Sequence, residues 1–244
     1  MEKSEIKIEK LKTANIEFKT EEKVTGEQLP GEQVTADQVT QEQVTADQLS
    51  TGDLILLSTR KWYSDIIEIG DDCIYSHCGI ILKDPTYIDP KLEGFYFLES
   101  GLEPFPDATD NQYHFGVQIV PFKKVIDEYV FEKEGSMFHR KLNCKRDKTF
   151  ERNLCKAYQI VKNKPYNCNP LDWLEALLGF HYFDRKITSR FWCSALVAYI
   201  YVQLGLIDNS IDWSLITPKE WSSYSNSQIL FLNGSNLEKE IPLL

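Results

Sequence analysis

The stretch RFWCSALVAYIY (residues 190–201) decides how the rest of the chain is interpreted. Every residue in it except Arg190 and Ser194 is apolar, so a helix formed here would be buried on all sides. Cys193 and Ser194 stand near its start. A thiol in such a segment can simply be a small core side chain. In the first turn of a buried helix, however, backbone N–H groups and the helix dipole also favour a thiolate, which is a nucleophile.

Length and composition indicate one sizeable folded domain with an extension. The 244 residues are 42% hydrophobic and 12% aromatic, which excludes a wholly disordered chain. The net charge of −10 argues against binding to nucleic-acid phosphates. The longest continuous apolar run, residues 195–202, is far shorter than the roughly 20 residues that a membrane span needs.

The start of the chain and the six cysteines indicate a reducing compartment. Residues 1–23 lack the apolar core of a secretory signal, and the cysteines include no CxxC pair. We therefore expect free thiols and a cytoplasmic location, with packaging into a virion left open.

A five-residue repeat, GEQLP GEQVT ADQVT QEQVT ADQLS, fills residues 26–50. Its period matches neither a helix nor a strand, and glutamine occupies the centre where a pentapeptide β-helix needs a large apolar residue. We predict a flexible N-terminal extension over residues 1–48, whose acidic repeat can bind a protein partner. The catalytic domain is predicted over 49–230 and a C-terminal tail over 231–244.

Apolar runs and turn residues predict the elements of the folded part. Strands are predicted at 54–57, 74–82, 95–100 and 117–121. Helices are predicted at 60–70, 122–131, 147–163, 171–178 and from about 190 to a stop at Gly205. Thr188 or Ser189 is the predicted N-terminal cap of the last helix. The pattern predicts an α+β fold in which a small antiparallel sheet packs on a central, Cys-bearing helix.

A cysteine hydrolase needs a base beside the thiol and a polar group that orients the base. Among four histidines, His77 is the best base because it lies inside an apolar strand and is followed closely by Gly79. His181 is the second choice, since it lies only twelve residues before Cys193. The remaining histidines, His114 and His139, lie in polar surroundings and are expected at the surface.

Glu99 is the predicted third member, because it is an acid at the exit of an apolar strand one hairpin from His77. Strand alternation places Tyr75, His77 and Gly79 on one face and points Cys78 away from them. Each choice has an ordinary structural alternative: a core thiol, a hydrogen-bonded core histidine and a strand-end charge. The residue pattern alone leaves Cys193 about equally open as nucleophile and as core side chain.

The order of motifs resembles the circularly permuted papain-like NlpC superfamily. The matching segments are GDLILL (52–57), SHCGIIL (76–82), FLES (97–100), KPYN (164–167) and FWCSALVAYIY (191–201). The resemblance is nearest to the YiiX-type and poxvirus-type proteins and more distant to lecithin:retinol acyltransferase. In the permuted branch the histidine precedes the cysteine, as it does here.

The resemblance implies a permuted papain-like fold and thiol chemistry on an acyl group. Cys193 would attack a carbonyl, His77 would move the proton, and Glu99 would hold His77. Tyr166, Trp192 and Ser194 are the implied substrate-binding residues. The substrate would be a peptide, an amide or a lipid acyl group, no metal or cofactor is implied, and a viral source fits the family.

Three other interpretations remain open at this stage. The chain can be a catalytically idle papain-like module that binds a partner, or a lipid acyltransferase or thioesterase. A third is a metal site made by Cys73, His77 and Cys78, although neighbouring ligands on a strand would point to opposite faces.

Overall fold

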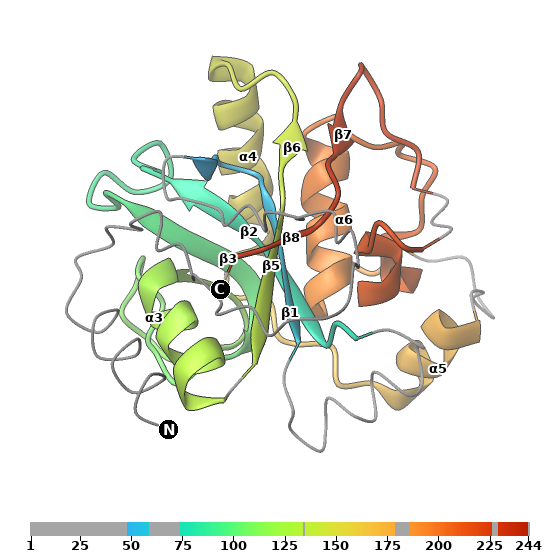
Figure 1. Cartoon of the computed structure of the whole chain (residues 1–244), viewed down its shortest axis with the longest axis horizontal. Helices are drawn as coiled ribbons and strands as arrows, with labels where there is room; N and C mark the ends of the chain where they lie inside the picture. Colours follow the sequence, from blue (N-terminus) through green and yellow to red (C-terminus); the bar gives the residue numbers. More distant parts are fainter. Residues whose placement is uncertain (1–47, 59–73, 134, 179–185, 226–228, 244) are drawn as a thin grey trace, which may run out of the picture.

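The computed structural model of the chain describes residues 48–58, 74–133, 135–178, 186–225 and 229–243. Their main feature is an antiparallel sheet of six strands in the order β4-β3-β2-β1-β5-β8 (Figure 1). The strands are β1 (Leu54–Ser58), β2 (His77–Lys83), β3 (Phe95–Leu102), β4 (Phe115–Pro121), β5 (Ser136–Arg140) and β8 (Ile241–Pro242).

Both faces of this sheet are covered, which explains why its central strands read as unbroken apolar runs. In β1, Leu54 and Leu56 belong to one core cluster, while Ile55 and Leu57 belong to a second cluster on the opposite face. The four side chains are fully buried. A strand with one solvated face would instead alternate apolar and polar residues.

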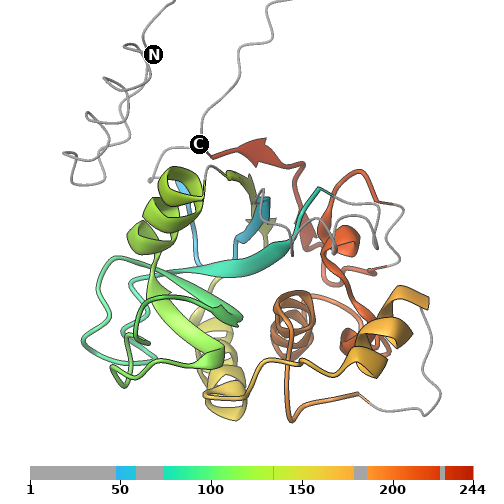
Figure 2. The ribbon, with the colours of Figure 1, turned by 90° about the horizontal axis from the view of Figure 1, so that it is seen from below.

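Helices form a layer on each side of the sheet (Figure 2). On one side lie α4 (Lys148–Val161) and α6 (Cys193–Gln203), whose side chains share the first core cluster. On the other side α3 (Phe122–Ile126) runs into the π-helix η2 (Asp127–Glu132) over the second cluster. The remaining elements are α5 (Pro170–Leu178), η3 (Trp213–Leu215), η4 (Pro218–Trp221) and the small pair β6 (Leu142–Asn143) and β7 (Asn236–Leu237).

The central helix α6 is buried along nearly its whole length, as its sequence predicts. Every residue from Cys193 to Val202 is buried, and the hydroxyl of Tyr201 donates a hydrogen bond of 2.7 Å to the carbonyl of Gly52. The helix stops at the predicted place, because Gly205 has a φ of +70°, which suits glycine. Burial on all sides makes this helix the support around which the other elements pack.

The predicted α+β class and antiparallel sheet are confirmed, but the sheet is larger than predicted. Strands β5 and β8 were not predicted, and the segment assigned to a C-terminal tail supplies β7 and β8. The helix predicted over 122–131 is α-helical only to Ile126 and then widens into η2. The helix predicted at 60–70 and residues 1–47 of the extension lie outside the described residues.

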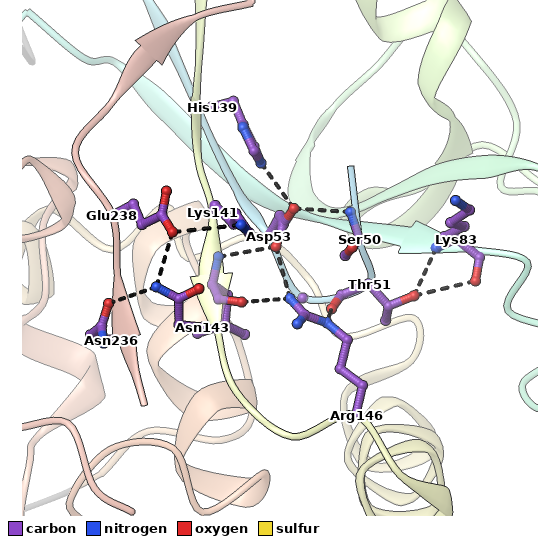
Figure 3. A network of polar contacts seen from close by, with 12 residues as sticks. Ser50, Thr51, Asp53, Lys83, His139, Lys141, Asn143, Arg146, Asn236 and Glu238 are labelled. Carbon is purple, nitrogen blue, oxygen red and sulfur yellow. Dashed lines mark hydrogen bonds and ion pairs between the residues drawn. The ribbon is translucent and has the colours of Figure 1, made fainter. Parts of the chain in front are cut away.

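A buried polar network fastens the start of β1 to β5 and β6 (Figure 3). Asp53 is fully buried and accepts hydrogen bonds from His139 Nε2 at 2.9 Å and from Arg146 at 2.8 Å. The backbone N–H groups of Ser50 and Leu142 donate to the same carboxylate. His139 is therefore a structural core residue, and its predicted place at the surface is wrong because β5 is an inner strand.

Candidate active site

His77 is the first residue of β2 and lies where three strands meet. Its backbone pairs with Leu57 of β1, and its ring lies over Gly101 of β3. A Cβ atom added to Gly101 would stand 3.3 Å from the Cε1 atom of His77 and 3.2 Å from a carboxylate oxygen of Glu99. A glycine at this position therefore leaves room for the imidazole and the carboxylate to lie side by side.

Glu99 and His77 make the contact that their sequence positions predict. Oε2 of Glu99 lies 2.5 Å from Nε2 of His77, and Glu99 is fully buried. The side-chain amide of Gln118 donates to the other oxygen of Glu99 at 3.3 Å. The imidazole is also packed between the ring of Tyr129, stacked at 6.0 Å and 12°, and that of Phe97. The ring is thus held in one orientation by packing and by a hydrogen bond.

Cys193 is the first residue of α6 and is 4% exposed. The helix has no side-chain cap, so the predicted cap by Thr188 or Ser189 is wrong; Trp192, in an extended conformation, precedes the helix directly. The segment that leads into the helix is held instead by residues of other elements. Ser100 of β3 donates to the carbonyl of Phe191 at 2.7 Å, and Phe191 also bridges to Tyr166.

The surroundings of Cys193 favour the thiolate. Hydrogen bonding to Cys78 and the nearby charge of His77 together outweigh burial and hold the pKa of the Cys193 thiol well below its usual range. Burial opposes a charged His77, yet Cys193 and Glu99 together raise the pKa of the imidazole well above its usual value. Both shifts favour the charged forms, which are a thiolate at Cys193 and an imidazolium at His77.

Cys78 does not point away from the site, and the sequence-based expectation about it is wrong. Its side chain lies in the same core cluster as Cys193, on the face of the sheet that α6 covers. Because His77 begins β2 and Cys193 begins α6, successive residues of the strand can both reach the thiol. None of the five described cysteines forms a disulfide.

Two further polar residues beside His77 were missed in the sequence. Glu103, which is 3% exposed, follows β3 directly and accepts a hydrogen bond of 2.9 Å from the hydroxyl of Tyr129. Burial, reinforced by the charge of Glu99, raises the pKa of Glu103 to about 7. Glu103 lies four residues after Glu99, so strand alternation could have placed both acids on one face. No sequence signal points to Tyr129.

The three predicted substrate-binding residues have different surroundings. Trp192 and Ser194 are buried, and their side chains both donate to the carbonyl of Ile216, at 2.8 Å and 2.7 Å. These bonds anchor the start of α6. Tyr166 is half-buried and stacks on the ring of Phe115 at 5.1 Å. Burial raises the pKa of the Tyr166 phenol well above its usual value, and the charge of Cys193 adds to this shift.

The other histidines and the alternative metal ligands lie elsewhere. His114 is bound by Asp110, at 2.9 Å between Nε2 and the nearer carboxylate oxygen, away from β2. His181 and Cys73 lie outside the described residues. Within the described ranges, no helix has both the length and the apolarity that crossing a membrane requires.

Comparison with known proteins finds similarity to solved structures. No family model and no curated protein matches the chain. Among solved structures, the metalloprotein yiiX from Escherichia coli O157:H7 (DUF1105) is similar with a TM-score of 0.43 and 19% sequence identity. The match covers 68% of this chain and 69% of that chain.

Proposed function

We propose that the protein is a cysteine-dependent hydrolase that cleaves an amide, peptide or ester bond through a thioacyl intermediate. The observation that supports this most is the meeting of Cys193, His77 and Glu99, which come from three elements. The thiol begins a buried helix, and the imidazole that perturbs its pKa is held by a carboxylate at 2.5 Å. A cysteine that only fills space in the core would not require an imidazole and a carboxylate beside it.

The contact between Glu99 and Nε2 assigns the roles of the two ring nitrogens. Glu99 holds the proton on Nε2, so Nδ1 is the nitrogen that receives the thiol proton. The Cys193 thiolate attacks the carbonyl carbon, and the backbone N–H groups of the first turn of α6 stabilise the oxyanion. His77 then protonates the leaving amine or alcohol. Water hydrolyses the thioester, which releases the acid and restores the thiol.

Tyr166 and Phe115 are the proposed substrate contacts nearest to the thiol. Phe115 is 49% exposed, and its ring stacks on that of Tyr166, whose backbone bridges to Phe191, two residues before Cys193. A partly exposed aromatic pair of this kind suits an apolar or planar group next to the scissile carbonyl. Trp192 and Ser194 are proposed to act indirectly, by fixing where α6 begins.

The residue order and a Cys-bearing helix packed on an antiparallel sheet support placing the chain in the permuted papain-like superfamily. A thiolate nucleophile also needs reducing conditions, which supports a reducing compartment. Both assignments are part of the proposal.

The first test is the rate at which each cysteine reacts with iodoacetamide between pH 4 and 9, followed by mass spectrometry. We expect Cys193 to react at low pH, where an ordinary thiol is inert, and His77→Ala to remove that behaviour. His114→Ala, which alters a histidine outside the site, is the matched control and should leave the profile unchanged.

An ordinary pH profile for Cys193 in the folded protein would overturn the proposal. The catalytically idle binding module would then be the better interpretation. If Cys193 reacts at low pH, amide, peptide and lipid ester substrates can be compared directly, and trapping of the acyl-enzyme separates the three classes.

A further inference from the structure

A cluster of buried polar groups lies beside His77, on the side of the ring where Nε2 faces Glu99. One ligand atom each from His77, Glu99 and Glu103 lie within 4.8 Å of one another, and all three residues are buried. Gln118, fully buried, reaches the same place through its hydrogen bond to Glu99. Thiol chemistry uses only two of these four residues.

This cluster has more hydrogen-bond acceptors than donors. Glu99 is bound at both oxygens, by His77 and by Gln118, and Oε1 of Glu103 is bound by Tyr129. Within the described part of the chain, however, Oε2 of Glu103 and Oε1 of Gln118 are buried and have no hydrogen-bond partner. Such atoms are rare in proteins and call for a specific explanation.

Lys133, whose charge acts on Glu103, does not supply the missing partner. Lys133 lies 3.8 Å from the ring centre of Tyr129 and pairs with Glu128 at 3.1 Å. The cluster therefore holds two carboxylates and one imidazole, with oxygen atoms still unpaired. A bound cation would satisfy these oxygens.

We propose that His77, Glu99 and Glu103 form a binding site for a zinc ion. One imidazole nitrogen and two carboxylate oxygens are ligands that zinc accepts, with Oε1 of Gln118 or a water as a fourth. Calcium and magnesium prefer sites made of oxygen alone, so the imidazole favours zinc over them. This ligand set differs from the Cys73, His77 and Cys78 set considered from the sequence, since it includes no sulfur.

Zinc at this site would switch off the proposed hydrolase, an effect that rests on the proposed function. An imidazole that binds a metal through Nε2 is neutral and carries its single proton on Nδ1. It cannot accept a second proton from Cys193. Zinc would also remove the contact between Glu99 and Nε2 that orients the ring.

The test is equilibrium dialysis of the chelator-treated full chain against zinc, with bound metal measured by mass spectrometry. We expect one zinc per chain in the unaltered protein and in Cys193→Ser. Glu103→Gln should weaken binding at least tenfold, because one ligand loses its charge. Glu151→Gln, which alters an exposed acid on α4, is the matched control and should bind zinc normally.

Two results would overturn the site: no bound zinc, or binding that Cys193→Ser removes and Glu103→Gln leaves intact. Should Glu103→Gln fail to fold, the visible spectrum of the unaltered chain with cobalt decides the matter. Nitrogen and oxygen ligands give weak bands only, whereas an intense thiolate-to-cobalt band would contradict the assignment.

Failure of the two proposals can be told apart. If metal-free Cys193 shows an ordinary pH profile while zinc still binds through Glu103, the hydrolase fails and the zinc site stands. If Cys193 reacts at low pH and zinc neither binds nor slows the reaction, the zinc site fails and the hydrolase stands.

Discussion

Cys78 is the side chain whose position changes the chemistry of Cys193 most directly. It lies on the α6 side of β2, within the same core cluster as Cys193, and its hydrogen bonding is the largest influence that lowers the pKa of that thiol. His77 adds its charge from the neighbouring strand position. The Cys193 thiol is thus approached by two successive residues of one strand.

Replacing Cys78 should therefore raise the pKa of Cys193. Cys78→Val replaces the thiol by a somewhat larger apolar side chain and removes the hydrogen bond. A hydrogen bond to a charged group is worth about 1.5–3 kcal/mol, or roughly 1–2 pH units in the labelling profile. Cys78→Ser retains a donor and should shift the profile less. The iodoacetamide profile of Cys193 measures both, and an unchanged profile in Cys78→Val would contradict this role.

Glu103 should make folding stability depend on pH. Its pKa rises from 4.5 to about 7 on folding, mainly through burial. At pH values below 4.5 the group is neutral in both states and has no effect. Between pH 4.5 and 7 the folded state holds the proton more tightly, so stability falls as the pH rises, by up to about 3 kcal/mol.

Urea unfolding of the metal-free protein from pH 4.5 to 7.5, with a chelator present, measures this contribution. Glu103→Gln cannot ionise, so its stability should fall less steeply over that range than the stability of the unaltered protein. Glu151→Gln should follow the unaltered protein. Parallel curves for Glu103→Gln and the unaltered chain would show that Glu103 titrates normally.

At the scale of elements, Gly79 sets how closely β2 and β3 approach. A Cβ atom at this position would lie 2.5 Å from the ring of Phe97 and 2.7 Å from the carbonyl of Leu98. Phe97 also contacts the ring of His77, with 6.3 Å between the ring centres. Any side chain here would disturb the packing of the strand and of the proposed base together.

We therefore expect Gly79→Ala to destabilise the fold by about 1–3 kcal/mol and to slow the low-pH labelling of Cys193. Lys83→Ala, at the exposed end of the same strand, should change stability by less than about 0.5 kcal/mol. Urea unfolding and labelling of the two variants check this. Normal stability in Gly79→Ala would mean that Phe97 can move away without cost.

Elements with continuous apolar sequences could be predicted, whereas very short elements and elements with polar sequences could not. The runs of β1, β2 and α6 determine their burial, and Gly205 determines where α6 ends. Strand β5, SMFHR, carries a polar pattern because its His139 and Arg140 are bound inside the fold. The position of Glu99 at a strand exit one hairpin from His77 predicted their contact, but the sequence could not show that α6 starts next to Cys78, because that depends on the tertiary packing.

At the scale of the whole molecule, segments far apart in the sequence meet in one sheet. Strand β8 is an edge strand of the sheet in which β1, the first described strand, is central. Strand β8 pairs with β5, which pairs with β1, so three distant segments lie side by side (Figure 1). Leu243 follows β8, is 1% exposed, and joins the core cluster under α3; its N–H donates to the carbonyl of Met137 at 2.8 Å. The second core therefore depends on residues near the C-terminus.

This arrangement predicts that one side chain near the end of the chain stabilises the entire fold. Leu243→Ala should cost about 2–5 kcal/mol, since it leaves a cavity in a closed core. Leu230→Ala is the matched control, because Leu230 is 62% exposed and its truncation should cost less than about 0.5 kcal/mol. Thermal and urea unfolding compare the two. Equal stability of the two variants would show that Leu243 contributes little to the second core cluster. A selective loss of stability in Leu243→Ala would show that this core, which covers one face of the sheet, requires the residue that follows β8.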